Sequence, residues 1–189
     1  MKEEYTLTVY TEDQIGLMNK IAIMFSRKKI SLKSLNISSC EIARMFRFTI
    51  VVNETSEIVK NLTLQIEKII DVFKCYCNSN EEIVIVQTVL YKVPTKVLMT
   101  AENFDVLLKK YSAKFVSVEK KYTFIEFTGQ ENEIDCLTLA FQKFELVEFV
   151  KSATISLIKS SEGFEKELKE LEEQAMQFHN SKLEYPNTL

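Results

Sequence analysis

A short segment near the start of the chain carries residue types that can bind a small zwitterion. It follows an alternating apolar and polar run at residues 5–10, and it precedes a run at residues 17–25 whose apolar side chains recur at helical spacing. The segment is therefore predicted to be a strand-to-helix turn. Its residues are Asp13, Gln14, Ile15, Gly16, Leu17 and Met18.

The start of a helix attracts anions, because its first backbone N–H groups lack intrahelical partners and carry the positive end of the helix dipole. Gly16 has no side chain to keep a ligand away from these groups, and Asp13 can accept hydrogen bonds from an ammonium group. Together they predict a site for both charged ends of a free amino acid. The simpler interpretation is that Gly16 only makes the turn and Asp13 only caps the helix. The pattern of residues leaves both interpretations open.

The 189-residue chain has the composition of a globular protein, with 46% hydrophobic residues. This length suffices for one large domain or two small ones, each with its own core. The net charge is -3 and lysines and glutamates are interspersed along the chain, which argues against binding to nucleic acid or to an anionic membrane. The chain starts with acidic residues, and no uncharged apolar run approaches the roughly 20 residues that span a bilayer. We therefore expect a cytoplasmic protein.

Motifs of enzymes are nearly absent. The single histidine, His179, lies in a polar C-terminal segment, and three glycines are too few for a phosphate-binding loop or a dinucleotide fingerprint. A zinc site would need a second close pair of ligands beside Cys75 and Cys77, which the chain does not offer. Those two, with Cys40 and Cys136, are expected to be small, largely buried side chains. We expect no catalytic residue, no metal site and no cofactor bound by this chain.

Apolar periodicity predicts the order strand, helix, strand, strand, helix, strand twice along the chain. In the first half, strands are expected at residues 5–10, 32–39, 45–52 and 72–77, and helices at residues 17–29 and 58–71. A short polar turn at residues 78–82 follows. In the second half, strands are expected at residues 83–91, 114–119, 122–128 and 146–158, the last with a kink at residues 151–152, and helices at residues 104–111 and 134–144.

This order predicts an α+β fold of two tandem ferredoxin-like βαββαβ units. Right-handed crossovers place both helices on one face of each antiparallel sheet and leave the other face bare, so we expect bare faces and edge strands to drive oligomerisation. Beyond them, residues 161–189 are rich in Glu and Lys and predict an amphipathic helix, with the C-terminal unit as its favoured packing surface. The apolar seam of that helix is Phe164, Leu168, Leu171, Ala175 and Phe178.

Three segments of the first half resemble the ACT domain of the acetolactate synthase small subunit family. They read Thr-Glu-Asp-Gln-Ile-Gly-Leu-Met at residues 11–18, Ile-Ala-Ile-Met-Phe-Ser-Arg-Lys at residues 21–28 and Ser-Leu-Lys-Ser-Leu-Asn-Ile at residues 31–37. The resemblance continues through the strand at Tyr122, the turn at Gly129 and Glu-Phe-Val-Lys-Ser at residues 148–152. It implies an ACT domain for effector binding and dimerisation at residues 1–80, a C-terminal ferredoxin-like domain at residues 81–160, and a charged helix and tail at residues 161–189.

The resemblance also assigns roles within the predicted site. Asp13 matches the Asn or Asp of the family that contacts the effector, and Gly16 matches its glycine at the helix start. Ser31, with Leu32 beside it, stands where the family usually has an Asn that faces the effector across a dimer. The chain departs from the family at Ile15, where a Pro or a small residue is common, and at Lys29, where a Gly is common.

The function that the resemblance implies is that of a non-catalytic regulatory subunit in branched-chain amino acid biosynthesis, the pathway of valine and isoleucine. The implied partners are the catalytic (large) subunit of acetolactate synthase, a second copy bound through the ACT domain, and an amino-acid effector, with valine as the usual effector of the family. Thiamine diphosphate, Mg and FAD would belong to the catalytic subunit. Two alternatives stay open: a free-standing ACT-type amino-acid sensor that acts on another enzyme, and a small enzyme on a ferredoxin-like scaffold.

Overall fold

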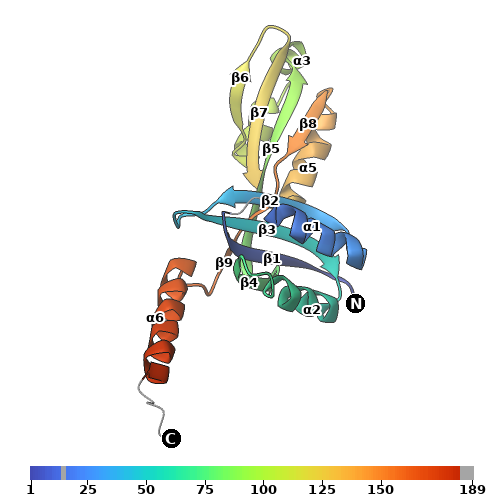
Figure 1. Ribbon diagram of the computed structural model, residues 1–189. Coiled ribbons are helices and arrows are strands. Elements are labelled where there is room, and N and C mark those ends of the chain that lie inside the picture. Colours follow the sequence, from blue (N-terminus) through green and yellow to red (C-terminus); the bar gives the residue numbers. More distant parts are fainter. Residues whose placement is uncertain (14–15, 184–189) are drawn as a thin grey trace, which may run out of the picture.

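The computed structural model describes residues 1–13 and 16–183, with side chains described as far as Glu173. Its N-terminal unit is a four-stranded antiparallel sheet with two helices on one face (Figure 1). The strands lie in the order β2-β3-β1-β4. The elements are β1 (Glu3–Glu12), α1 (Leu17–Lys28), β2 (Leu32–Ser39), β3 (Met45–Glu54), α2 (Ser56–Ile66) and β4 (Val72–Ser79).

The C-terminal unit repeats this topology, with strands in the order β6-β7-β5-β8 and a further strand, β9, paired with β5. Its elements are β5 (Ile83–Pro94), α3 (Thr95–Thr100), α4 (Phe104–Tyr111), β6 (Lys114–Val118), β7 (Tyr122–Gly129), α5 (Glu131–Gln142), β8 (Glu148–Lys151) and β9 (Ile155–Ile158). A last helix, α6 (Phe164–Leu183), extends away from both sheets (Figure 1). The predicted α+β fold of tandem βαββαβ units with a C-terminal helix is confirmed.

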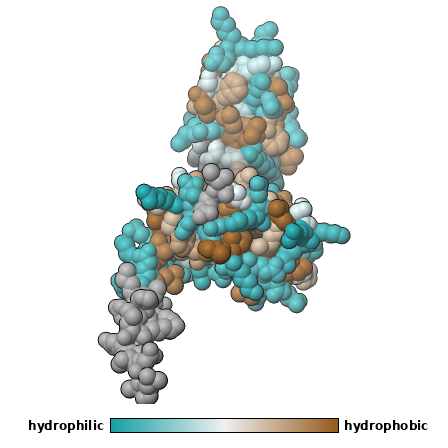
Figure 2. Space-filling model, in the orientation of Figure 1, coloured by the Kyte–Doolittle hydropathy of each residue, from teal (hydrophilic) through white to brown (hydrophobic). Residues whose placement is uncertain are grey.

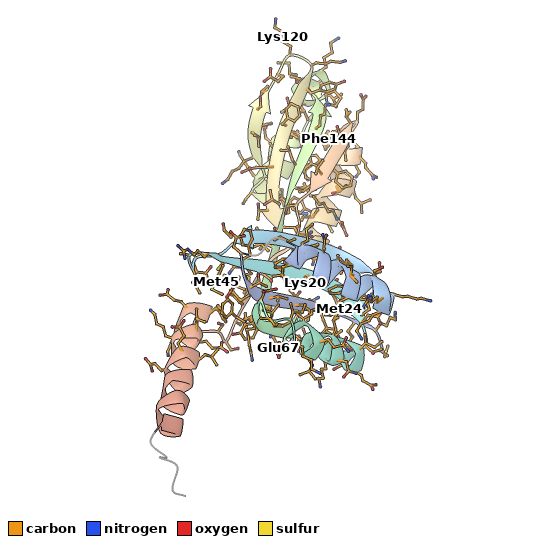
Figure 3. The ribbon with its side chains drawn as sticks, in the orientation of Figure 1. Lys20, Met24, Met45, Glu67, Lys120 and Phe144 are labelled. Atoms are coloured by element: carbon orange, nitrogen blue, oxygen red, sulfur yellow. The ribbon has the colours of Figure 1, made fainter. Side chains whose placement is uncertain are left out.

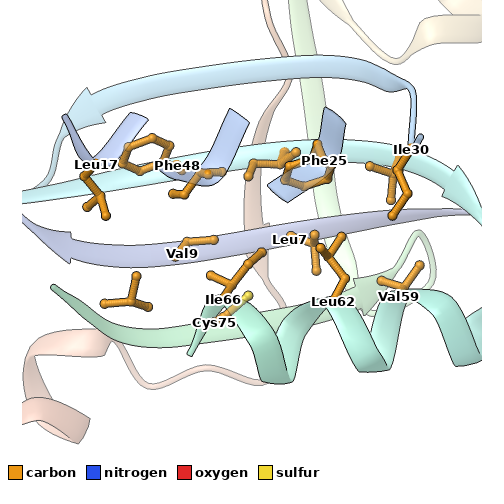
Figure 4. Close-up of a cluster of buried hydrophobic side chains, with 14 residues drawn as sticks. Leu7, Val9, Leu17, Phe25, Ile30, Phe48, Val59, Leu62, Ile66 and Cys75 are labelled. Atoms are coloured by element: carbon orange, nitrogen blue, oxygen red, sulfur yellow. The ribbon is translucent and has the colours of Figure 1, made fainter. Parts of the chain in front are cut away.

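The core of the N-terminal unit lies between its sheet and its two helices (Figure 4). Side chains alternate across a strand, so Leu7 and Val9 of β1 face the helices while Thr6, Thr8 and Tyr10 face the other way. Each helix contributes a buried stripe at spacings of three or four residues. The stripes are Leu17, Ile21 and Phe25 on α1 and Val59, Leu62 and Ile66 on α2.

Three element boundaries differ from expectation. Helix α2 ends at Ile66 rather than near residue 71, and residues 67–71 form turns that bring Val72 to the sheet edge. Helix α3 was not expected, because residues 95–100 lack a helical apolar stripe. The strand expected at residues 146–158 is divided into β8 and β9. At the break, Ser152 N donates to Thr88 O over 2.7 Å and Ser152 Oγ accepts from Thr88 N over 2.9 Å, so pairing with β5 continues through the bend.

The second face of the N-terminal sheet is covered, contrary to the expectation of a bare face. Thr6 of β1 has 0% exposure, and Thr8, Thr49 and Val51 on the same face are also buried. The cover comes from the C-terminal half of the chain: β9 pairs with the first residues of β5, and Thr154 N donates a hydrogen bond to Ser34 Oγ of β2 over 3.0 Å. A small sheet with one apolar face and one threonine-rich face thus buries both against its own chain.

Helix α6 begins against this second face, so the expectation that it packs on the C-terminal unit is wrong. The ring of Phe164 stacks on Tyr10 with 3.9 Å between centroids and meets Tyr76 edge-on. Tyr76 also donates a hydrogen bond to Glu167, and Met45 lies beside this cluster (Figure 3). The physical reason is the course of β9, which carries the chain past the N-terminal sheet before the helix starts. Among the described residues, no helix is long and apolar enough to cross a membrane.

Candidate functional site

The turn between β1 and α1 is built on a left-handed glycine. Gly16 has φ 91° and ψ -7°, and its carbonyl accepts the first helical hydrogen bond from Lys20 N over 3.1 Å. A side chain at this φ is strained, which explains the glycine. A Cβ placed there would meet no atom of the described residues within 4 Å. Glycine is therefore required here by its φ angle and not by crowding, and Gly16 itself is exposed.

Some of the residues around Gly16 hold the turn in place, and others have exposed side chains. Asp13 N donates to Arg44 O over 3.0 Å, which fixes the end of β1, while the Asp13 side chain is exposed. Leu17 is buried in the core, whereas Met18 is 54% exposed beside the turn. Gln14 and Ile15 of the predicted site lie outside the described residues. Asp13 and Gly16 thus lie at the two ends of this turn, and the binding role of these residues stays a prediction.

Ser31 and Leu32 lie at the opposite end of α1. The helix closes with Lys29 in a left-handed conformation, φ 56°, whose N–H donates to Ser26 O, while Ile30 N donates to Phe25 O. A helix of 12 residues is about 18 Å long, so Ser31 is separated from Gly16 of the same chain by that length. The two halves of the predicted site therefore cannot contact one ligand within a single chain.

Strand β2, which follows Ser31, is an edge strand with a bulge. Its register against β3 shifts between Leu32 and Ser34, which places Lys33 at the irregularity. A bulge changes the direction of a side chain, and here Lys33 Nζ lies 2.6 Å from Glu4 Oε2 and 2.7 Å from Glu131 Oε2. Partial burial lowers the pKa of Lys33, but the hydrogen bonds to Glu131 and Glu4 outweigh it and leave the pKa raised. The ammonium group stays charged and links the two units.

A cleft of about 930 Å³ lies between the units, beside Lys33. Most of its charged groups pair with each other, since Lys151 Nζ lies 2.7 Å from Asp135 Oδ1 and Lys33 Nζ binds Glu4 and Glu131. Lys159 Nζ instead donates a hydrogen bond to Glu81 O over 2.7 Å. The charged groups of the cleft therefore already have partners within the chain. Sequence reasoning missed Lys33 and Ser34 as links to the C-terminal unit. The one available signal was that these two polar residues are adjacent, in a strand where apolar and polar residues otherwise tend to alternate.

The described residues hold no cluster of three or more His, Cys, Asp or Glu side chains with the geometry of a metal site. Cys75 is buried, and burial raises the pKa of its thiol to about 12, so it is not a nucleophile near neutral pH. Cys77 also has a raised pKa, for the same reason. Cys136 is exposed, contrary to the expectation for the cysteines.

Comparison with known sequences assigns both units to one family. Residues 7–74 match the profile of the acetolactate synthase (AHAS) small subunit-like ACT domain, and residues 86–160 match the profile of the small subunit of acetolactate synthase. The chain belongs to the acetolactate synthase small subunit family. The resemblance noted in the sequence is thereby confirmed across both units, while the helix α6 lies beyond the matched residues.

Relatives in this family are distant but similar along most of their length. The chain is 26% identical over 159 residues to the acetolactate synthase small subunit of Mycobacterium bovis, covering 84% of this chain and 94% of that protein. It is 27% identical over 163 residues to the small subunit of Bacillus subtilis, covering 86% and 93%. The crystal structure of the small subunit from Thermotoga maritima superimposes with a TM-score of 0.75 at 18% identity, covering 84% of this chain and 99% of that one. That structure supports the fold.

Proposed function

We propose that this chain is a non-catalytic regulatory subunit that binds the catalytic subunit of an acetolactate synthase, raises its activity and conveys feedback from an amino acid. Family membership supports the association, because small subunits are named as parts of that enzyme. Thiamine diphosphate, Mg and FAD belong to the catalytic partner in this proposal. A subunit without chemistry can alter a rate only by binding two states of its partner with different affinity.

One observation supports a shared effector site: its two halves, the Gly16 turn and Ser31, lie at opposite ends of α1. A two-fold axis that pairs α1 and β2 with their counterparts brings the Gly16 turn of one chain to Ser31 of the other. The surfaces for such pairing are present: β2 is an edge strand, and its Leu32 and Leu35 are partly exposed, as is Met18 on α1. In the resulting site, the helix start receives the effector carboxylate, Asp13 receives its ammonium group, and Ser31 contributes a hydroxyl.

Light scattering tests the pairing directly. We expect a dimer at micromolar concentration, and a monomer of 22.0 kDa would contradict a site shared between subunits. The whole chain is needed for this measurement, because residues 83–86 and 155–158 help to cover the second face of the N-terminal sheet.

Titration of the full chain into the matching catalytic subunit tests the regulatory role. Acetolactate formation is expected to rise by about 5-fold to 150-fold, the range of a coupling free energy of 1–3 kcal/mol. The chain alone is expected to form no acetolactate. If a complex forms without a rise in rate, the activating role is wrong; if no complex forms while calorimetry still detects amino-acid binding, the chain is a free-standing sensor.

A further inference from the structure

A groove between α1 and α2 forms an exposed surface that the effector site does not use. It has a volume of about 650 Å³, and its apolar lining residues are Ile23, Met24, Ile69 and Ile70. Ile70 is 99% exposed, although isoleucine is usually buried. Figure 2 shows hydrophobic residues gathered on this face of the N-terminal unit with hydrophilic residues around them, and Figure 3 shows Lys20 and Met24 between the two helices.

The rim of the groove is basic. Four cations line it: Lys20, Arg27, Lys28 and Lys68. Lys20 pairs with Asp71 at 2.7 Å, whereas the other three have no ion-pair partner among the described side chains. A groove with an apolar lining and unpaired cations along its edge fits an amphipathic helix that carries carboxylates beside its apolar seam. Two copies of this face would place like charges against each other, which argues against its pairing with itself.

Helix α6 has the complementary character. Beyond Phe164 and Leu168, which contact the sheet, its seam continues at Leu171, which is 42% exposed. Exposed carboxylates flank Leu171: Glu170 and Glu172 lie about 100° to either side of it on the helix, and neither has an ion-pair partner among the described side chains. By sequence the seam continues at Ala175 and Phe178. The rim from Lys20 to Lys28 runs for about 12 Å, which α6 can span after Leu168.

The two surfaces cannot meet within one chain. Phe164 stacks on Tyr10, whose side chain lies on the face of the sheet opposite to α1 and α2. The sheet therefore separates α6 from the groove of its own chain, and Figure 1 shows α6 directed away from the body. We propose that the α1–α2 groove is the docking site for α6 of a second copy, with the Leu171 seam on the apolar lining and Glu170 and Glu172 beside the unpaired cations. This contact is independent of the proposed regulatory function.

Cross-linking locates the contact in the full-length protein. A photo-reactive phenylalanine derivative is placed at position 171 in a mixture of unlabelled and ¹⁵N-labelled chains. We expect cross-links between chains, mapped by mass spectrometry to peptides that contain Ile23, Arg27 or Lys68. Cross-links confined to one chain, or formed only with a catalytic subunit when it is added, would overturn the proposal.

Charge exchange tests the complementarity. The groove variant is Arg27→Glu, Lys28→Glu and Lys68→Glu, and the helix variant is Glu170→Lys and Glu172→Lys. Only cross-links from the probe-bearing chain to the ¹⁵N-labelled chain are counted. The probe-bearing helix variant with labelled unchanged protein, and probe-bearing unchanged protein with labelled groove variant, are each expected to give at least tenfold fewer cross-links. The probe-bearing helix variant with labelled groove variant should recover most of the yield. The matched control, Lys109→Glu, Lys120→Glu and Lys143→Glu, reverses three exposed lysines of the C-terminal unit and should change little. Loss without recovery, or equal loss in the control, would contradict the pairing. One molar salt should also reduce the yield.

Discussion

Lys33 and Glu131 form an ion pair of 2.7 Å between β2 of the N-terminal unit and the first turn of α5 in the C-terminal unit. Lys33 follows directly after Ser31 and Leu32, two residues of the candidate effector site, and it occupies the irregularity in β2. Ser34, the next residue, accepts a hydrogen bond from Thr154 N over 3.0 Å. The strand that would contact an effector is thus joined to the other unit by two consecutive side chains.

Replacing Glu131 should weaken the response of acetolactate formation to the effector more than it lowers the free energy of unfolding. Glu131→Gln keeps the shape and removes the charge, and because both partners are partly exposed we expect the free energy of unfolding to fall by less than about 1 kcal/mol in urea titrations. In the proposed complex, the response of acetolactate formation to the effector should weaken. The control is Asp135→Asn, which breaks a pair of the same length with Lys151 inside one unit. An equal loss of response in both variants would contradict a special role for Lys33.

Substitutions at Gly16 should separate backbone strain from charge. Gly16→Ala is expected to cost about 1–2 kcal/mol in urea unfolding because of the left-handed conformation, and Gly16→Asn less, since Asn tolerates it. Gly16→Asp resembles Gly16→Asn in shape but adds a negative charge at the helix start. Calorimetry should therefore show amino-acid binding weakened far more by Asp than by Asn. Binding that is unchanged in Gly16→Asp would place the effector elsewhere.

Lys29→Gly should stabilise the protein. Lys29 closes α1 with φ 56°, a conformation that glycine adopts without strain. The relief of strain exceeds the added freedom of the unfolded chain, so we expect a gain of about 0.5–1 kcal/mol in the free energy of unfolding. The midpoint of urea unfolding should rise with an unchanged slope. A fall in the midpoint would mean that the Lys29 side chain has a stabilising role of its own.

Phe164→Ala should detach α6 from the sheet. Phe164 is buried against Tyr10 and Tyr76, and truncating such a ring costs about 3 kcal/mol. Limited proteolysis is expected to cut more rapidly between β9 and α6. Glu165→Ala on the same helix is the control and should cost under about 1 kcal/mol, because its side chain is exposed and pairs only with Lys169. If both substitutions lowered the free energy of unfolding by similar amounts, the stacking of Phe164 on Tyr10 would not be what holds α6 on the sheet.

Alkaline pH should destabilise the protein through Cys75. Burial raises the pKa of its thiol from 9.0 to about 12, so the folded protein keeps this proton longer than the unfolded chain does. The contribution to stability is complete below about pH 9 and is lost as the pH rises toward about 12, at roughly 1.4 kcal/mol per pH unit. In urea unfolding between pH 8.5 and 10.5, the free energy of unfolding should fall less steeply with pH for Cys75→Ala than for the unchanged protein. Replacing the exposed Cys136 should leave this pH dependence unchanged.

Much of the site was predictable because its signals are local. The alternation before Asp13, the helical spacing after Leu17 and the glycine between them predict a strand, a turn and a helix whose start is open. The separation of Ser31 from that turn also follows from the length of the helix. The neighbours of Lys33 were not predictable, since its partner Glu131 lies 98 residues further along the chain.

The sequence by itself determined the βαββαβ order of both units and the core-facing side of most elements, because strand and helix periods are properties of adjacent residues. Only the tertiary structure decided what covers those faces. The threonines of β1 read as an exposed row, yet β9 and Phe164 bury them, and α6 reads as a helix for the C-terminal unit, yet it starts on the N-terminal sheet. A periodic pattern shows that a surface needs a partner, whereas the choice of partner depends on the path of the chain between segments more than 100 residues apart.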